Sequence, residues 1–290
     1  MRKKSRGRRG PRLGAAAVAA VVGAGLACAY TTFGASLIAS ADAPRHAAVT
    51  ESSTTGSSPT TPVLSRPVPD PILPFNAKLT STDIPVPGGG VRSGACSGSL
   101  IDARWVVTAG HCFHDVNDVR VGGKPRYDMT VTLGKLKDSD TGGESAQVVD
   151  VRQSAVNDLA VVKLSAPITG ITPLKLATEP PAKGQPLRFI GWGSVSATVV
   201  APSDHLKRGQ FTVAKIRQTT LEAAPVVTRT VENSPCKDDS GGPFFTSDDD
   251  RTGTLVAIVN DGPACPQPGL EVIARVDVVA GWIQEQIAGG

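Results

Sequence analysis

The 290-residue sequence has few aromatic residues, few methionines and no internal repeat. Aromatic side chains make up only 4% of the chain, whereas it contains 31 glycines and 23 prolines. This composition favours short strands joined by frequent turns over long helices. Because no segment repeats at a period of about 20–50 residues, solenoids and propellers are excluded.

The main part of the chain also has no excess of positive charge. The formal net charge is +4, but seven of the 30 basic residues lie within residues 1–12, which contain no acid. Beyond residue 41 the chain carries 23 basic and 26 acidic residues, a net charge of −3. We therefore expect no nucleic-acid partner.

The first 41 residues predict a signal peptide. The basic segment at residues 1–12 precedes an uncharged, largely apolar stretch, residues 13–41, and Ala39-Ser40-Ala41 fits a small-x-small cleavage site. The alternative is an uncleaved membrane anchor, because about 20 apolar residues suffice to span a bilayer. We expect a secreted protein that contacts a membrane only if this segment stays uncleaved.

Residues 42–71 predict a disordered linker or pro-segment. They are rich in Ser, Thr and Pro, and such a segment buries too little apolar surface to offset the entropy lost on ordering. The folded part is then expected to cover residues 72–290. This length suffices for one large domain or two small barrels that share an interface.

Short apolar runs separated by turn signals fill the folded part. Examples are Trp105–Thr108, Leu159–Leu164 and Leu255–Val259. Many strands with frequent turns indicate an all-β barrel or sandwich. The one expected helix is terminal, because apolar residues follow helical spacing over Val278–Ile287 and the run ends at Gly289.

The cysteines indicate disulfide bonds. Cys28 is lost with the signal peptide, which leaves four in the exported protein: Cys96, Cys112, Cys236 and Cys265. Four cysteines allow three pairings, and the most local one, Cys96–Cys112 with Cys236–Cys265, closes two short loops. A zinc site built from His111, Cys112 and His114 is an alternative, but it lacks a second ligand pair at metal spacing. We expect no metal.

Three segments place reactive side chains in small-residue turns or at the start of a strand: Cys96–Cys112, Asn157–Leu164 and Cys236–Pro243. The first ends in a β-type run that delivers His111. The second has Asp158 directly before a buried strand. The third carries Ser240 in a tight turn followed by two glycines, which let the backbone approach a substrate closely.

These three side chains fit the needs of nucleophilic catalysis. A serine hydroxyl attacks at neutral pH only with a base within hydrogen-bonding reach, and histidine has a suitable pKa. A carboxylate that accepts the second imidazole N–H fixes the tautomer and stabilises the imidazolium. Backbone N–H groups of the serine turn can bind the oxyanion. The sequence therefore predicts His111, Asp158 and Ser240 as a catalytic triad.

The same segments resemble the trypsin/chymotrypsin family of serine proteases over about residues 73–288. The resemblance rests on the family's histidine, aspartate and serine boxes and on two further landmarks: Thr108–Cys112, Asp158–Val162, Asp239–Pro243, Gly191–Gly193 and Gly281–Ile283. It implies two antiparallel six-stranded β-barrels with a C-terminal α-helix. It also implies both local disulfides, protein or peptide substrates, no cofactor and a monomer.

The resemblance assigns the oxyanion hole to the backbone N–H groups of Asp238 and Ser240. Family members have glycine where this chain has Asp238, and a carboxylate there repels a developing oxyanion. Family members also begin with a freed Ile-Val-Gly-Gly, whose amino group pairs with the acid before the serine, here Asp239. No such start precedes Cys96, so we expect another cation or another activation step.

The substrate pocket implied by the resemblance consists of Ser234, Asn260, Gly262 and Glu271, with Ser234 at its base and Glu271 on the opposite wall. Asn260 and Asp261 replace the family's Ser-Trp on the substrate-pairing strand. Ser234 favours an apolar or aromatic side chain before the scissile bond, whereas Glu271 favours Lys or Arg. We expect a secreted serine endopeptidase that acts through an acyl-enzyme. The alternative is a binding module with a protease fold whose oxyanion turn no longer works because of Asp238.

Overall fold

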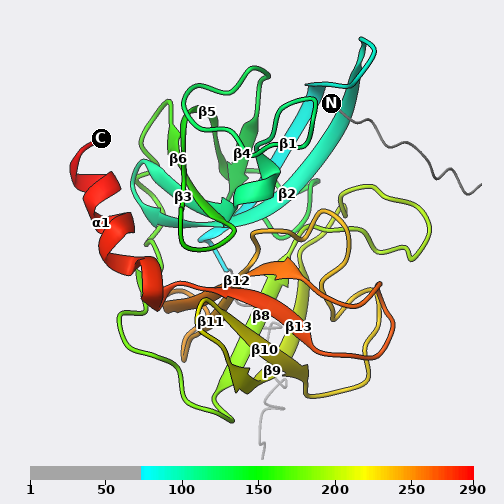
Figure 1. The fold of residues 1–290 in the computed structure, drawn as a ribbon, viewed down its shortest axis with the longest axis vertical. Helices are drawn as coiled ribbons and strands as arrows, with labels where there is room; N and C mark the ends of the chain where they lie inside the picture. Colours follow the sequence, from blue (N-terminus) through cyan, green and yellow to red (C-terminus); the bar gives the residue numbers. More distant parts are fainter. Residues whose placement is uncertain (1–72) are drawn as a thin grey trace, which may run out of the picture. The chain divides into compact units, whose positions relative to one another are not determined.

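The computed structural model describes residues 73–290 (Figure 1). The predicted signal peptide, residues 1–41, and the predicted linker, residues 42–71, lie outside the described residues. The strands are β1 (Asn76–Pro85), β2 (Val91–Asp102), β3 (Trp105–Ala109), β4 (Thr130–Leu133), β5 (Glu144–Gln153), β6 (Leu159–Leu164), β7 (Lys175–Leu176), β8 (Pro186–Gly191), β9 (Lys207–Ile216), β10 (Thr220–Pro225), β11 (Pro243–Thr246), β12 (Thr254–Asp261) and β13 (Glu271–Arg275). Two short 3₁₀ helices, η1 (Gly110–Cys112) and η2 (Asp277–Val279), and one α-helix, α1 (Ala280–Ala288), complete the elements.

The first six strands form a closed barrel in the order β1-β2-β3-β6-β5-β4, with every neighbouring pair antiparallel. In β4, Val131 and Leu133 are buried and the alternating Thr130 and Thr132 are partly exposed, as expected for a strand with one face inward. Strand β3 is buried at all five positions. It needs apolar residues on both faces because its outer face meets the second barrel.

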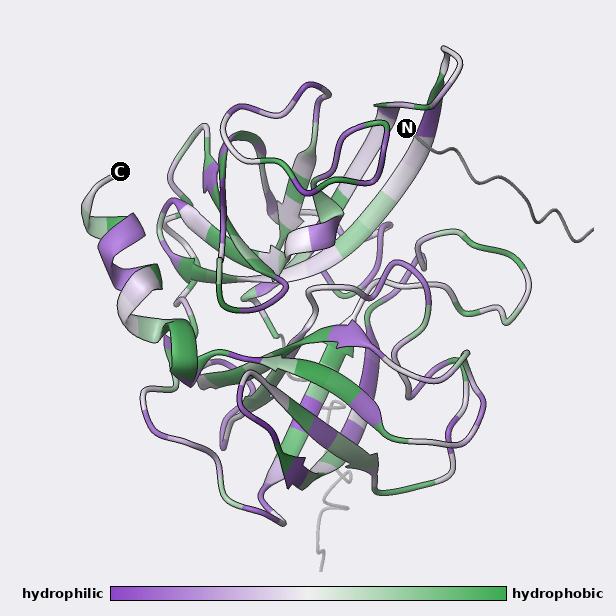
Figure 2. Ribbon diagram, in the orientation of Figure 1, coloured by the Kyte–Doolittle hydropathy of each residue, from purple (hydrophilic) through white to green (hydrophobic). Residues whose placement is uncertain are grey.

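The second barrel has the order β11-β8-β9-β10-β13-β12 and is closed by the pairing of β11 with β12, while β7 adds to β12 in parallel. Its core contains Phe189, Phe211 and Phe244, whose rings meet at 5.1–6.3 Å between centroids. Hydrophobic stretches, green in Figure 2, lie along β12 and β13 of this barrel. The predicted architecture of two six-stranded antiparallel barrels is confirmed.

The two barrels share an interface that is partly apolar and partly hydrogen-bonded. One continuous apolar cluster contains Val106 of β3 together with Ile258 of β12. At its edge, the backbone N–H of Trp192 donates to Ser97 Oγ at 2.8 Å, and its indole Nε1 donates to Asn76 Oδ1 at 2.8 Å. These contacts join the residue that follows β8 in the second barrel to β1 and β2 of the first barrel.

The terminal helix α1 packs on the first barrel. Its Ile283 is fully buried in the same apolar cluster, and Arg152 of β5 donates to the carbonyl of Gln286 at 2.8 Å. The prediction of a terminal helix is confirmed. The α-helix begins two residues later than predicted because the 3₁₀ turn η2 precedes it. No helix within residues 73–290 combines the length and apolar character needed to cross a bilayer.

Both local disulfides form. Cys96–Cys112 has an S–S distance of 2.01 Å, and Cys236 is bonded to Cys265. Since Cys112 is in a disulfide, it has no thiolate to offer a metal, and the alternative zinc site is wrong. The part of the chain that the structure describes contains no group of three or more His, Cys, Asp or Glu side chains that could hold a metal ion.

Candidate active site

His111 lies on the 3₁₀ turn that directly follows β3. Gln153 of β5 holds this turn by donating to the carbonyls of Gly110 and Phe113, at 2.9 and 3.3 Å. A Cβ atom at Gly110 would lie 2.6 Å from the carboxylate of Asp158. Only glycine therefore lets the two segments approach closely enough for His111 and Asp158 to meet.

Asp158 immediately precedes β6 and binds His111 twice. Its Oδ1 accepts the backbone N–H of His111 at 2.9 Å, and its Oδ2 lies 2.6 Å from His111 Nδ1. Arg120 also donates to Oδ1 at 3.2 Å. Burial raises the pKa of Asp158, but the hydrogen bonds from His111 and the charge of Arg120 outweigh it, so the pKa lies below its ordinary value. The carboxylate is ionised at neutral pH and orients the imidazole.

Ser240 lies in the turn before β11, which packs directly against the histidine segment. Gly241 has φ +83°, and a Cβ atom there would lie 2.2 Å from Thr108 Oγ1. The carbonyl of Ser240 accepts the N–H of Ser97 at 2.9 Å. His111 and Ser240 line the same cavity of about 220 Å³. No hydrogen bond joins the Ser240 hydroxyl to His111 within residues 73–290, and such bonds are commonly long before substrate binds.

The backbone around Ser240 is suited to bind an oxyanion. Neither the N–H of Asp238 nor that of Ser240 donates to any group within residues 73–290. Asp238 has φ +71°, a left-handed conformation that aspartate tolerates better than most residues. Its carbonyl accepts the Ser97 hydroxyl at 3.2 Å, which helps to orient this part of the turn. Asp238 thus keeps a backbone conformation that glycine adopts readily.

The side chain of Asp238 nevertheless brings a carboxylate close to this turn. The residue is partly buried. Burial raises the pKa of Asp238 to about 6, and the neighbouring charge of Asp239 adds to the rise. The carboxyl group is therefore mostly ionised at pH 8 and mostly protonated at pH 5.

Asp239 pairs with a cation that sequence reasoning missed. Lys207, the first residue of β9, places Nζ 2.5 Å from Asp239 Oδ2, and both side chains are fully buried. The carboxylate also accepts the N–H groups of Gly193 at 2.7 Å and Cys236 at 2.8 Å. A Cβ atom at Gly193 would lie 2.3 Å from this carboxylate, which explains glycine after Trp192.

A second cavity of about 210 Å³ adjoins Ser240. Asn260, Gly262 and Glu271 line it, as expected for the substrate pocket. Ser234 does not line it: its side chain is buried and its hydroxyl bonds to Asn233 Oδ1 at 2.9 Å. The structure therefore brings three of the four predicted pocket residues together.

Glu271 is neutralised by a partner that the sequence did not reveal. Its carboxylate pairs with Arg229, and both side chains are only 2% exposed. Burial raises the pKa of Glu271 to about 7, although the charge of Arg229 opposes the rise. Within the described residues, Nε and Nη2 of Arg229 have no hydrogen-bond partner.

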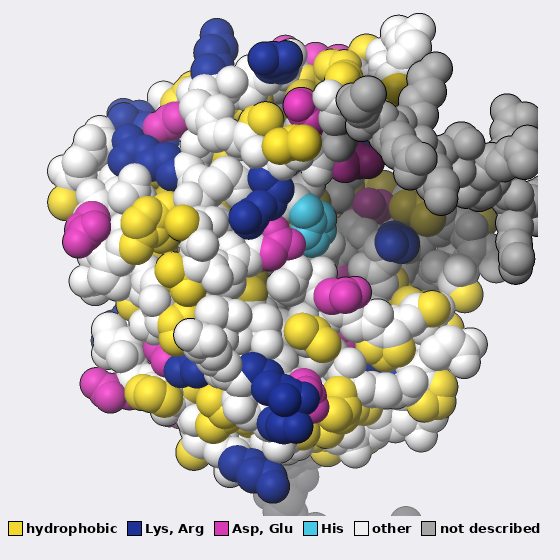
Figure 3. Space-filling view, viewed as in Figure 1, with side chains coloured by type: hydrophobic (Ala, Val, Ile, Leu, Met, Phe, Trp, Pro, Cys, Tyr) yellow, Lys and Arg dark blue, Asp and Glu magenta, His cyan; other side chains and the backbone are white. Residues whose placement is uncertain are grey.

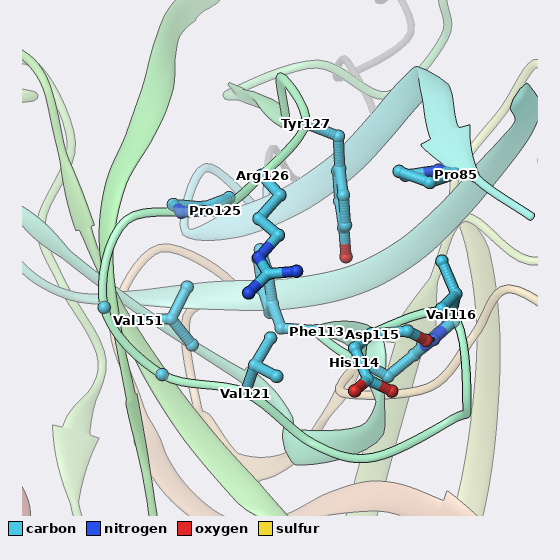
Figure 4. A pocket seen from close by; sticks show the side chains of 12 residues that line it. Pro85, Phe113, His114, Asp115, Val116, Val121, Pro125, Arg126, Tyr127 and Val151 are labelled. Carbon is cyan, nitrogen blue, oxygen red and sulfur yellow. Dashed lines mark hydrogen bonds between the residues drawn. The ribbon is translucent and has the colours of Figure 1, made fainter.

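A separate apolar cavity of about 130 Å³ lies beside the segment that follows His111 (Figure 4). Its lining includes Phe113, Tyr127 and Val151, and the Tyr127 hydroxyl donates to the carbonyl of Cys112 at 3.1 Å. None of the three predicted triad residues lines it, so it is not the predicted catalytic cleft. The space-filling view shows a histidine side chain at the surface next to acidic and basic side chains (Figure 3).

The comparisons with known proteins agree with this fold. The chain matches the family model described as Trypsin over residues 73–283, which makes it a hydrolase of the serine protease class. A "Snake venom serine protease" of Crotalus durissus durissus is 29% identical over 222 residues, which covers 67% of this chain and 78% of that protein. Human "Trypsin-3" is 27% identical over 230 residues, covering 74% and 69%. The chain belongs to the trypsin family of serine proteases.

Proposed function

We propose that the protein is a secreted serine endopeptidase that hydrolyses peptide bonds through an acyl-enzyme. The observation that carries this proposal is the position of His111, whose Nδ1 is bound by an ionised Asp158 while its side chain faces the cavity that also contains Ser240. An imidazole held in this way has Nε2 free to take the proton of the Ser240 hydroxyl.

The reaction follows from this arrangement. Ser240 Oγ attacks the carbonyl carbon as His111 Nε2 takes its proton, and the N–H groups of Asp238 and Ser240 bind the oxyanion. His111 then gives the proton to the amide nitrogen, the C–N bond breaks, and the amine leaves. Water attacks the acyl ester with His111 again as base, which releases the acid and restores the Ser240 hydroxyl.

Export from the cytoplasm is part of the same proposal. Two disulfides in one chain are typical of oxidising compartments. The predicted signal peptide at residues 1–41 and the similarity to a snake venom protease agree with this. N-terminal sequencing of the exported product distinguishes a cleaved signal from an uncleaved anchor at residues 13–41.

A binding module with a protease fold is the second candidate, because Asp238 places a carboxylate in the oxyanion turn. Labelling with a fluorophosphonate separates the two. We expect one covalent adduct, mapped by mass spectrometry to Ser240 and absent from Ser240→Ala. An intact, folded protein that gains no adduct would establish the binding module instead.

Replacing Asp238 with glycine is expected to raise kcat at pH 8 by roughly tenfold, which corresponds to about 1.4 kcal/mol. The change removes both the strain of a left-handed aspartate and the charge that repels the oxyanion. Since the pKa of Asp238 is about 6, protonation removes that charge in acid. The ratio of variant to wild-type kcat is therefore expected to fall as the pH is lowered from 8 to 5.

The matched control for this prediction is Asp238→Asn, which keeps the size of the side chain and removes only the charge. We expect the kcat of Asp238→Asn to exceed the wild-type kcat at pH 8 by the part of the increase that comes from removing the charge. This difference should become smaller as the pH is lowered to 5. Steady-state peptide hydrolysis between pH 5 and 9 measures both variants. An asparagine variant no faster than wild type at pH 8 would show that charge at this position has no effect on turnover.

The substrate pocket is expected to favour an uncharged side chain before the scissile bond. Glu271 is already paired with Arg229, so no unbalanced carboxylate is left for Lys or Arg. Arg229→Met leaves the Glu271 carboxylate without its partner and able to bind a basic side chain. We expect kcat/KM for substrates with Lys or Arg before the scissile bond to rise by about tenfold relative to substrates with Leu there. The assay is run at pH 9, because loss of Arg229 moves the pKa of Glu271 above its present value of about 7.

The double variant Arg229→Met with Glu271→Gln is the control for this prediction. It lacks both charges and should show no gain for basic substrates. Digestion of a peptide library by each protein gives the preference directly. A wild-type protein that already cleaves mainly after Lys and Arg would contradict the neutral pocket.

A further inference from the structure

The carboxylate of Asp239 holds the turn that presents Ser240. One of its oxygens accepts the N–H of Gly193 and the other accepts the N–H of Cys236. The backbone of Asp239 continues this network: its N–H donates to the carbonyl of Cys236 at 3.2 Å, and its carbonyl accepts the N–H of Gly242 at 2.9 Å. The position of Asp239 therefore sets the conformation of the residues on either side of it.

Asp238 and Ser240, which lie on either side of Asp239 in the chain, are the two residues that offer backbone N–H groups to the oxyanion. Asp238, with its left-handed φ of +71°, is joined directly to Asp239, and Ser240 follows Asp239 in the chain. If the carboxylate of Asp239 swung out to water, the peptides of Asp238 and Ser240 would rotate with it. Loss of one oxyanion donor lowers turnover by about 10²–10³-fold.

A fully buried carboxylate needs a cation, and Lys207 supplies it. Its Nζ contacts Asp239 Oδ2 at 2.5 Å and donates to the carbonyl of Ser194 at 3.2 Å, and neither charged side chain is exposed. Removing one partner of such a pair leaves an uncompensated charge in the interior. Burial already raises the pKa of Asp239, and Lys207 opposes that rise.

Lys207 is part of the second barrel itself. It pairs with Gly191 across strands β8 and β9. The cation is therefore in place as soon as this barrel has folded. The first described residues serve other contacts: Leu73 is fully buried in the apolar core, and the carbonyl of Phe75 accepts the N–H of Leu100 at 2.9 Å.

We propose that Lys207 is a positioning residue that keeps the oxyanion turn assembled from within the barrel, so that the protein cleaves peptides with the segment before residue 73 still attached. This inference rests on the proposed protease function. Because Lys207 supplies the cation for Asp239, activity does not depend on a newly cut amino terminus. Lys207 contacts no substrate and acts only through Asp239.

The test compares the activity of one preparation before and after the residues up to Pro69 are removed. The full chain receives a recognition site for a specific endopeptidase after Pro69, and intact mass confirms that the chain is uncut. We expect the uncut chain and the trimmed chain to hydrolyse peptides with kcat values within about twofold of each other. An uncut chain that stays inactive until trimming would overturn the inference and leave the protease function standing. Inactivity of both forms, without phosphonate labelling, would overturn both.

Lys207→Ala tests the positioning role directly. We expect kcat to fall by about 100-fold or more, with KM changed less than about threefold, because the donors act in the transition state. Millimolar methylammonium should restore part of kcat by filling the vacated cation site. Lys215→Ala, at an exposed position of the same strand, is the matched control and should equal wild type. Wild-type kcat in Lys207→Ala would overturn the inference.

If Lys207→Ala does not fold, the paired variant Lys207→Met with Asp239→Asn removes both charges and avoids a lone buried ion. We expect this variant to fold and to react with the fluorophosphonate at least about tenfold more slowly than wild type, because asparagine has one acceptor oxygen for two N–H donors. Labelling at the wild-type rate would overturn the proposal.

Discussion

Ser240→Ala is expected to lower kcat for peptide hydrolysis by about 10⁶-fold while leaving KM within about threefold. The substitution removes the hydroxyl that forms the acyl-enzyme but leaves the pocket and the oxyanion donors in place. His111 and Asp158 lie on the other barrel and keep their contact. The residual rate, above that of water alone, comes from binding and from the oxyanion hole.

The matched control for this prediction is Ser165→Ala, which removes a hydroxyl from an exposed residue of the first barrel. It should leave kcat unchanged. Burst kinetics with an ester substrate give a second readout, because only an enzyme that forms an acyl intermediate releases the first product in a burst. A Ser240→Ala protein with more than about 1% of wild-type kcat would exclude Ser240 as the nucleophile.

Asp158→Asn is expected to lower kcat by about 10⁴-fold at pH 7. Asparagine has nearly the same shape, but it cannot compensate an imidazolium and its amide favours the wrong tautomer of His111. The pKa of Asp158 lies below its ordinary value, so in wild type this interaction is fully present above about pH 4 and is lost only in stronger acid. The acid limb of the wild-type kcat profile therefore reports another group.

Arg120→Gln provides the comparison for this prediction. Arg120 donates to the same Asp158 oxygen as the His111 backbone but is partly exposed, so its charge is screened. We expect a loss of about tenfold or less. Equal losses in Asp158→Asn and Arg120→Gln would contradict the assignment of Asp158 as the residue that orients His111.

Much of the fold could be predicted from the sequence because its evidence is local. Short apolar runs with turn residues between them gave the strands, and Leu159–Leu164 matches β6 residue for residue. The local pairing of the four cysteines is also confirmed. The predicted triad residues were recognisable because each lies in a distinctive short segment. In the histidine segment, for example, Gly110 leaves room for the carboxylate of Asp158.

The two buried ion pairs were not predictable in this way. Lys207 and Asp239 are 32 residues apart, and Arg229 and Glu271 are 42 apart, so each pair forms only when the second barrel closes. In the sequence, Lys207 lies between Leu206 and Arg208, and nothing near it indicates a buried cation. The sequence predicts Glu271 as a free carboxylate on the pocket wall, whereas in the fold Arg229 lies beside it and pairs with it.

A crystal structure of the protein after reaction with a peptide phosphonate tests the catalytic geometry most directly. We predict a covalent bond from phosphorus to Ser240 Oγ, one phosphonyl oxygen within about 3 Å of the N–H groups of both Asp238 and Ser240, and His111 Nε2 next to Ser240 Oγ. A phosphonate bonded elsewhere would contradict the account. So would an Asp238 peptide whose N–H points away from the phosphonyl oxygen.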